Sequence, residues 1–135
     1  MRADLTATLP EPVRAAVDWR QDEPAWRRAD IPALAQAAEE AGLACIGGQV
    51  QLRLPGVTAE LYWCDYDPAP RRQAEPWSEY SSRSWREIVF LVDALPTDEA
   101  LIEGARKTLP ELSDSEPSQF ADAVWFVVYL AVPES

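Results

Sequence analysis

The chain has 135 residues, a length that fits one domain, and we expect a single domain over residues 1–135. It holds 23 acidic and 12 basic residues and no histidine, for a net charge of −11. This charge argues against nucleic acid and anionic membranes as partners, because both are bound mainly through basic residues. The lack of histidine excludes triads, dyads and metal sites that use it. No apolar run approaches the ~18 residues of a membrane helix and no signal peptide is evident, so we expect a cytoplasmic protein.

A short helix is predicted near the N-terminus. Pro10 stands where a first helical turn tolerates proline, and Val13, Ala16 and Val17 share one face as far as Trp19. This pattern is typical of a helix that packs one side on a core.

The next stretch is predicted to be a surface linker followed by a second helix. Residues 21–29 carry charge and Pro24, and Trp26 is the residue in them that a core could hold. Asp30 is suited to cap the second helix, because its carboxylate can accept the first free backbone N–H groups. Gly42 can supply the left-handed residue that ends it.

A β-hairpin is predicted over residues 49–64. Apolar and polar residues alternate strictly from Gln49 to Leu54, as in a half-buried strand, and Pro55-Gly56 suits a turn. Gly47-Gly48 is interpreted as a bulge or turn that feeds this hairpin. The returning strand, residues 57–64, places on its inner face Ala59, Leu61 and Trp63.

Two further helices are predicted after a long connection that covers residues 65–82. Ser84 and Glu87 have the spacing of a capping box, and the helix that they open ends before Pro96. Thr97 then caps another helix. Its apolar row and the segment after it comprise Leu101, Ala105, Leu109 and Leu112.

The last predicted element is a strand over residues 123–132. These ten residues carry no charge and are rich in β-branched and aromatic types, which favours a central strand buried on both faces. We therefore expect an α+β fold, in which a small antiparallel or mixed sheet is covered by about four helices.

The sequence offers few candidates for catalytic or metal-binding residues. Asp65 and Asp67 have the spacing of a D-x-D site for a hard cation such as Mg²⁺, with Glu60 as a third ligand only if the strand bends. The competing interpretation is that both begin a loop. Cys45 and Cys64 are expected to be buried, inert thiols, because no histidine can hold a thiolate. We expect no catalytic residue, no resident metal and no cofactor.

Acidic and aromatic side chains together indicate a binding surface. Residues 75–135 hold 12 acids and 4 bases, a net of −8. An acidic surface steers basic partners, although the same charge also serves solubility. Exposed tryptophan and tyrosine dominate binding energy at interfaces, although here they are equally compatible with a lid over the sheet. The candidate partner-binding residues are Trp77, Tyr80, Trp85, Asp98, Glu99, Glu103, Glu111, Asp114 and Glu116.

With these features, the chain resembles the small cytosolic immunity proteins of bacterial toxin systems. The strand from Gln49 to Leu54, the Pro55-Gly56 turn and the segment Glu60-Leu61-Tyr62-Trp63 look like a hairpin of that class. The resemblance implies tight binding of a cognate toxin that blocks its active site or substrate surface. An acidic inhibitor would suit a basic toxin such as a nuclease. Arginine supplies 11 of the 12 bases and asparagine is absent, which favours a bacterial origin.

Two alternatives stay open. An acidic secretion chaperone would bind an extended segment of an exported effector, and such chaperones are also small, acidic and mixed α/β. A Mg²⁺-dependent enzyme would use Asp65 and Asp67. The three hypotheses differ in ligand: a folded toxin domain, an unfolded export segment, or a metal with a small substrate.

Overall fold

Five strands form one antiparallel sheet in the computed structural model, which describes residues 4–133. Their order across the sheet is β1-β2-β5-β3-β4, so that β5 lies between β2 and β3. The predicted α+β fold and the central position of the last strand are therefore confirmed. The strands are β1 (Asp18–Arg20), β2 (Glu23–Trp26), β3 (Ala44–Leu54), β4 (Val57–Glu60) and β5 (Val124–Ala131).

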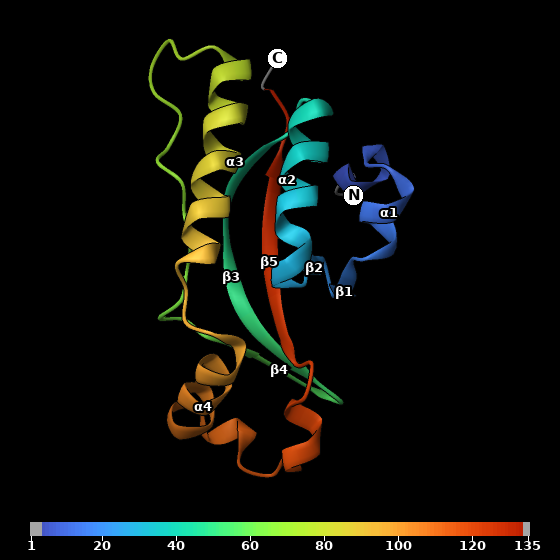
Figure 1. Cartoon of the computed structure of the whole chain (residues 1–135), viewed down its shortest axis with the longest axis vertical. Coiled ribbons are helices and arrows are strands. Elements are labelled where there is room, and N and C mark those ends of the chain that lie inside the picture. Colours follow the sequence, from blue (N-terminus) through green and yellow to red (C-terminus); the bar gives the residue numbers. More distant parts are fainter. Residues whose placement is uncertain (1–3, 134–135) are drawn as a thin grey trace.

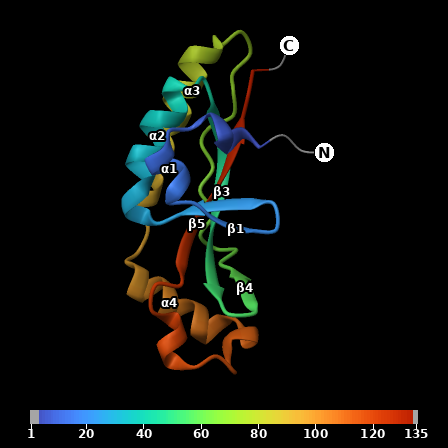
Figure 2. The ribbon, with the colours of Figure 1, turned by 90° about the vertical axis from the view of Figure 1, so that its right-hand side faces the viewer.

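Three of the helices, α1, α2 and α3, lie on one side of this sheet, as Figure 2 shows. Helices α2 and α3 run alongside each other over β3 and β5, and α4 lies beyond the lower end of the sheet (Figure 1). Within residues 4–133, no helix has the length and apolar character needed to cross a membrane. The helices are α1 (Glu11–Ala15), α2 (Ile31–Glu40), α3 (Trp77–Asp93) and α4 (Asp98–Thr108).

The hairpin of β3 and β4 is confirmed. Leu54 pairs with Val57 across the Pro55-Gly56 turn, and Gly56 has φ 73°, a value that glycine adopts without strain. Strand β4 ends at Glu60, earlier than predicted. Trp63, expected on the inner face, is 42% exposed because the chain has already left the strand.

The bulge predicted at the double glycine lies directly before it, at Ile46. The register of β3 against β5 shifts between Cys45 and Gly47. A Cβ atom on Gly48 would lie 2.1 Å from the carbonyl oxygen of Val127 and 2.2 Å from the ring of Tyr66. Only glycine allows this close approach, so the missing Cβ of Gly48 lets the Tyr66 ring lie over the strand.

The apolar core fills the space between the sheet and the helices. Strand β3 contributes alternate residues to it, as the spacing of its apolar side chains requires. Helices α2 and α3 meet it with Leu34 and Ile88, both fully buried. The largest fully buried side chains are Trp26, Trp85, Tyr66, Phe126, Ile31, Leu34, Leu52, Leu54, Leu61, Ile88, Val50 and Val92.

The predicted surface linker over residues 21–29 is wrong. This stretch contains β2, and Trp26 is fully buried while its indole N–H donates to the carbonyl oxygen of Val13 at 3.0 Å. The predicted first helix also ends early, at Ala15, and Trp19 lies in β1. Charge and proline indicated a surface segment, but Pro24 lies where the pairing of β2 with β5 ends, so a missing N–H is tolerated there.

The predicted capping box at Ser84 is also wrong. Helix α3 begins at Trp77, inside the stretch interpreted as a connection, and Ser84 is fully buried in its middle. The Ser84 hydroxyl donates to the carbonyl oxygen of Ser81 at 2.8 Å and accepts from the backbone N–H of Cys45 at 3.1 Å. It ties the helix to β3 instead of opening a helix.

Most remaining helix boundaries agree with the sequence. Gly42 has φ 77° after α2, and the Thr97 hydroxyl accepts from the N–H of Ala100 at 3.2 Å at the start of α4. Asp30 precedes α2, but its side chain makes no capping hydrogen bond, because a 3-10 turn, Arg28–Asp30, leads directly into the helix.

Candidate functional site

The predicted acidic residues gather at the lower end of the molecule. Residues 98–122, which we call the acidic end, carry seven acids and two bases, a net charge of −5. Asp98 is half-buried, and the other five candidates are exposed: Glu99, Glu103, Glu111, Asp114 and Glu116. The structure thus brings the predicted acids to one region of the surface.

The acidic end is held in place by apolar anchors. Leu101 and Ala105 on the inner side of α4, with Leu109 and Leu112 after it, are all buried, as their spacing predicts. Arg28 fixes the start of α4, because its guanidinium donates to Asp98 at 3.1 Å and to the carbonyl oxygen of Val92 at 2.7 Å. Glu99 and Glu103 therefore project from an anchored helix, and Glu111, Asp114 and Glu116 follow in the turns after it.

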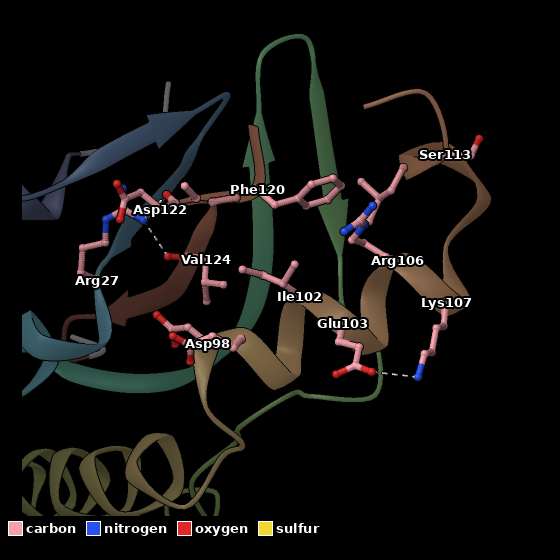
Figure 3. Close-up of a pocket in the computed structure, with 14 residues that line it drawn as sticks. Arg27, Asp98, Ile102, Glu103, Arg106, Lys107, Ser113, Phe120, Asp122 and Val124 are labelled. Carbon is pink, nitrogen blue, oxygen red and sulfur yellow. Dashed lines mark hydrogen bonds and ion pairs between the residues drawn. The ribbon is translucent and has the colours of Figure 1, made fainter. Parts of the chain in front are cut away.

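A groove of about 840 Å³ lies between α4 and the segment that leads into β5 (Figure 3). Glu99 and Glu103 contribute carboxylates to its wall, and Ile102 and Phe120 contribute apolar surface. Its basic groups already have partners. Lys107 donates to Glu103 at 3.0 Å, Arg106 lies 4.7 Å from the centre of the Phe120 ring, and Arg27 donates to the carbonyl oxygens of Asp122 and Val124.

The three aromatic candidates do not belong to this surface. They lie on α3, whose first residue is Trp77, whereas the acids follow on α4 and beyond. Tyr80 and Trp85 are buried, which corrects the prediction that they contact a partner; Trp85 donates from its indole N–H to the carbonyl oxygen of Leu43 at 2.8 Å. Trp77 is half-buried and donates to the carbonyl oxygen of Gly42 at 2.8 Å. The reason is the early start of α3, which turns these rings toward the core.

Sequence reasoning missed the aromatic side chains that are exposed. Phe90 on α3 is 71% exposed, and Tyr62 is 64% exposed with its ring 4.9 Å from that of Trp63. Trp19 is 44% exposed on β1. The only sequence signal for Tyr62 was its place on the outer face of the predicted strand, where it alternates with the inward Leu61. Nothing in the sequence pattern indicated that Trp19 is exposed, because it was assigned to a helix.

A polar network fills the sheet face opposite the helices. Both carboxylate oxygens of Glu23 accept hydrogen bonds, from Gln49 at 2.8 Å, from Gln51 at 3.0 Å and from the Tyr129 hydroxyl at 2.5 Å. Burial, and then the neighbouring Glu23 carboxylate, raise the pKa of Tyr129. Arg53, almost fully buried, donates to Gln51 and to the backbone carbonyl of Glu23 at 3.0 Å each. The polar groups of this network form hydrogen bonds with one another, so we interpret the network as one that stabilises the sheet.

The two aspartates of the D-x-D pattern are exposed on either side of the buried Tyr66. The carboxylate of Asp67 lies against Gly47, and the charge of Asp65 acts on Glu60, whose pKa is raised by partial burial and then by Asp65. Among residues 4–133, no three acidic, cysteine or histidine side chains are grouped as metal ligands would be. The Mg²⁺-dependent activity stays a prediction.

Both cysteines are buried thiols, as predicted. Burial raises the pKa of Cys45 to about 12, and its thiol donates to the carbonyl oxygen of Gly47 at 3.3 Å. Burial also raises the pKa of Cys64. Neither thiol is held as the thiolate that a nucleophile requires.

A second groove, of about 550 Å³, lies beside the upper half of β5. We call it the edge groove. Its walls come from the β1–β2 hairpin, from the residues before and within the first 3-10 turn, and from the bulge of β3. The residues that line it are Asp4, Leu5, Thr6, Trp19, Gln21, Asp22, Pro24, Ile46, Val128, Tyr129 and Leu130.

Comparison of the chain with protein-family models, with curated proteins and with solved structures found no match.

Proposed function

We propose that this chain is a non-catalytic protein-binding domain that neutralises a basic bacterial toxin by direct contact through the acidic end. The observation that carries the proposal is the net charge of −5 over residues 98–122, with five of the six predicted carboxylates exposed on an anchored helix and the turns after it. A surface of this kind suits a partner rich in arginine and lysine.

The carboxylates would act in two ways. At a distance they attract a basic partner and raise its association rate by about tenfold or more at low salt. In contact, they occupy cationic side chains that a nuclease would otherwise use to hold phosphates. Glu99 borders the groove of Figure 3 and has no ion-pair partner among the described residues, so its carboxylate is available to a cation of the partner.

The test starts from the tagged protein, used to capture partners from the source organism at low and at moderate salt. The expected partner forms a 1:1 complex, is basic, and stops growth when it is expressed alone but not when it is co-expressed with this chain. A captured protein that is harmless when expressed alone would contradict neutralisation.

A matched pair of variants then tests the surface. Glu99→Lys with Glu103→Lys reverses two charges on the acidic end, and Glu39→Lys with Glu40→Lys makes the same change at the exposed end of α2. We expect the first pair to slow association by about tenfold or more and the second to have a smaller effect. Equal effects would mean that total charge, not the acidic end, determines binding.

The secretion chaperone is the second candidate, and the edge groove is the observation that favours it. A chaperone of this kind holds an extended segment of its cargo, and the edge groove runs along a strand with exposed apolar side chains at Trp19 and Ile46. Two copies of this chain on one secreted effector, instead of one copy on a folded toxin, would distinguish the chaperone.

A further inference from the structure

Among residues 4–133, the upper half of β5 has a neighbouring strand on one side only. Strand β5 pairs with β3 along its whole length, from Val124 to Ala131. On its other side, the register with β2 covers Phe126 and Val127 alone. Beyond that point no strand among the described residues pairs with β5, because the β1–β2 hairpin crosses β5 and runs away from its upper half (Figure 2).

The backbone groups of Leu130 point toward this open side. In a strand, successive N–H and C=O groups alternate between the two neighbours. The carbonyl oxygen of Val124 accepts from Arg27, and Phe126 pairs with Trp26, so the even-numbered residues face the β2 side. The carbonyl oxygen of Val127 faces the opposite side, where it accepts from the Tyr66 hydroxyl at 2.6 Å.

Proline keeps β2 from continuing the ladder. The register of β2 with β5 places Pro24 opposite Val128, and Pro24 has no N–H to donate. Within the described part of the chain, the carbonyl oxygen of Val128 and both backbone groups of Leu130 therefore have no strand partner on this side. An edge of this kind is a template for another extended chain.

The edge groove adds apolar and acidic side chains that an added strand would contact. Ile46 is 55% exposed and Trp19 is 44% exposed, and both line the groove together with Leu130. Asp4 and Asp22 add carboxylates to its rim. A strand that occupied the groove would find apolar surface for alternate side chains and negative charge for basic ones.

We propose that the edge groove binds an extended segment of a partner polypeptide, which adds to the sheet as a strand beside Val128–Leu130, with apolar side chains against Trp19 and Ile46 and a basic residue toward Asp4 and Asp22. Backbone hydrogen bonds supply affinity in strand addition, and the pockets for alternate side chains supply specificity. The inference goes beyond the role of the acidic end and does not depend on it.

The negative charge at the edge groove favours a segment of another polypeptide over a second copy of this chain. Two copies joined at this edge would bring Asp4 and Asp22 of both into one interface, and each copy carries a net charge of −11. Like charges placed together oppose such an interface. A segment with basic residues has the complementary charge.

The experiment uses the intact protein and a synthetic eight-residue peptide that alternates lysine and valine. The control is the same peptide with every second backbone amide methylated, on the edge that would pair with β5. Methylation keeps the side chains and the charge but removes the N–H donors of that edge. Calorimetry measures binding, and amide hydrogen exchange by NMR measures protection at Leu130. We expect the plain peptide to bind and to slow exchange at Leu130 by about tenfold or more, while the methylated peptide does neither.

Two substitutions locate the site. Ile46→Lys places a cation in the edge groove, and Phe90→Lys makes the same change at an exposed residue on α3. We expect Ile46→Lys to weaken peptide binding by about tenfold or more and Phe90→Lys to leave it nearly unchanged. The proposal is overturned if neither peptide binds, if both bind equally, or if the two variants weaken binding alike.

A second copy is tested in the same protein without peptide. If Leu130 becomes protected as protein concentration rises, the edge pairs with another copy and the proposed occupant is wrong. Neutralisation by the acidic end has a separate readout, growth of cells that express the toxin, so failure of one idea leaves the other standing.

Discussion

From Gly47 to Leu54, strand β3 is buried on both of its faces, one of which is apolar and the other polar. On one side Val50, Leu52 and Leu54 pack under the helices with no exposed surface. On the other side Gln49, Gln51 and Arg53 are also buried, and each hydrogen-bonds to residues of the β1–β2 hairpin or β5. Alternation in a sequence thus reports which residues share a face, but not whether the polar face meets water.

The polar face stays buried because its donors have partners: Gln49, Gln51 and Arg53 each donate to Glu23 of the β1–β2 hairpin, and Arg53 also donates to Gln51 within β3. A buried polar group without a partner costs about 1–3 kcal/mol, so such a face is stable only when it is satisfied. No buried side-chain nitrogen or oxygen among the described residues lacks a partner. The network therefore fixes how the hairpin folds over the sheet, and with it the walls of the edge groove.

The largest expected effect is on the apolar face. Leu52→Ala removes a fully buried side chain from the central region of the sheet, and we expect the free energy of unfolding to fall by about 3–5 kcal/mol, from lost transfer energy and a cavity. Denaturant unfolding measures it. A loss below about 1 kcal/mol would mean that the surrounding core collapses into the space.

The polar face is tested by Arg53→Met. The Arg53 side chain is 1% exposed and donates to Asp18 at 2.7 and 2.9 Å as well as to Gln51 and Glu23. Methionine fills similar volume but leaves these acceptors unpaired, so we expect a loss of about 2–3 kcal/mol. Arg14→Met, at an exposed pair with Glu11, is the control and should cost less than about 1 kcal/mol. Equal losses would mean that the network is no more than a surface ion pair.

A single polar link on the apolar side gives a smaller effect. Ser84→Ala removes the acceptor of the Cys45 N–H and one donor to Ser81, and the alanine leaves a buried N–H without a partner. We expect a loss of about 1–2 kcal/mol, measured by thermal unfolding, and almost none for Ser78→Ala at an exposed position of the same helix. If Ser84→Ala were neutral, the attachment of α3 to β3 would rest on packing alone.

The sequence predicts the elements whose signals are local. The hairpin turn at Pro55-Gly56, the end of α2 at Gly42 and the cap at Thr97 each depend on one residue type in one conformation. The charge-free run of β5 similarly predicts a central strand. These signals need no knowledge of the rest of the fold.

The errors have one cause, which is that distant partners change the meaning of a residue. Glu23 and Pro24 indicate a surface segment until Gln49, Gln51 and Tyr129 are placed against Glu23. Of the candidate site, the acids were predictable because charge keeps them at the surface. The aromatic rings were not, since their exposure depends on where α3 begins.

The smallest expected effect concerns a second arginine, Arg83 on α3, whose guanidinium also donates to the carbonyl oxygens of Ala69 and Pro70 in the segment before the helix. Its guanidinium donates to Glu75 at 2.9 Å and to Glu87 at 2.6 Å. The hydrogen bond from Arg83, followed by that from the backbone N–H of Arg72, lowers the pKa of Glu75 from 4.5 to about 2. Glu87 has a lowered pKa too, first through the backbone N–H of Ala69 and less through Arg83.

A lowered folded-state pKa gives stability that is present above the unfolded value and is lost as pH falls through the folded value. The contribution of Glu75 is therefore complete above about pH 5 and is lost between about pH 4.5 and pH 2. We expect Glu75→Gln to have a lower melting temperature than the parent at pH 6 and to converge with it near pH 2. Arg83→Gln should remove most of the same difference, because it withdraws the first cause of the shift. If the gap between Glu75→Gln and the parent persisted at pH 2, the ionised carboxylate of Glu75 would not be what stabilises the start of α3, and packing of the side chain would account for the loss.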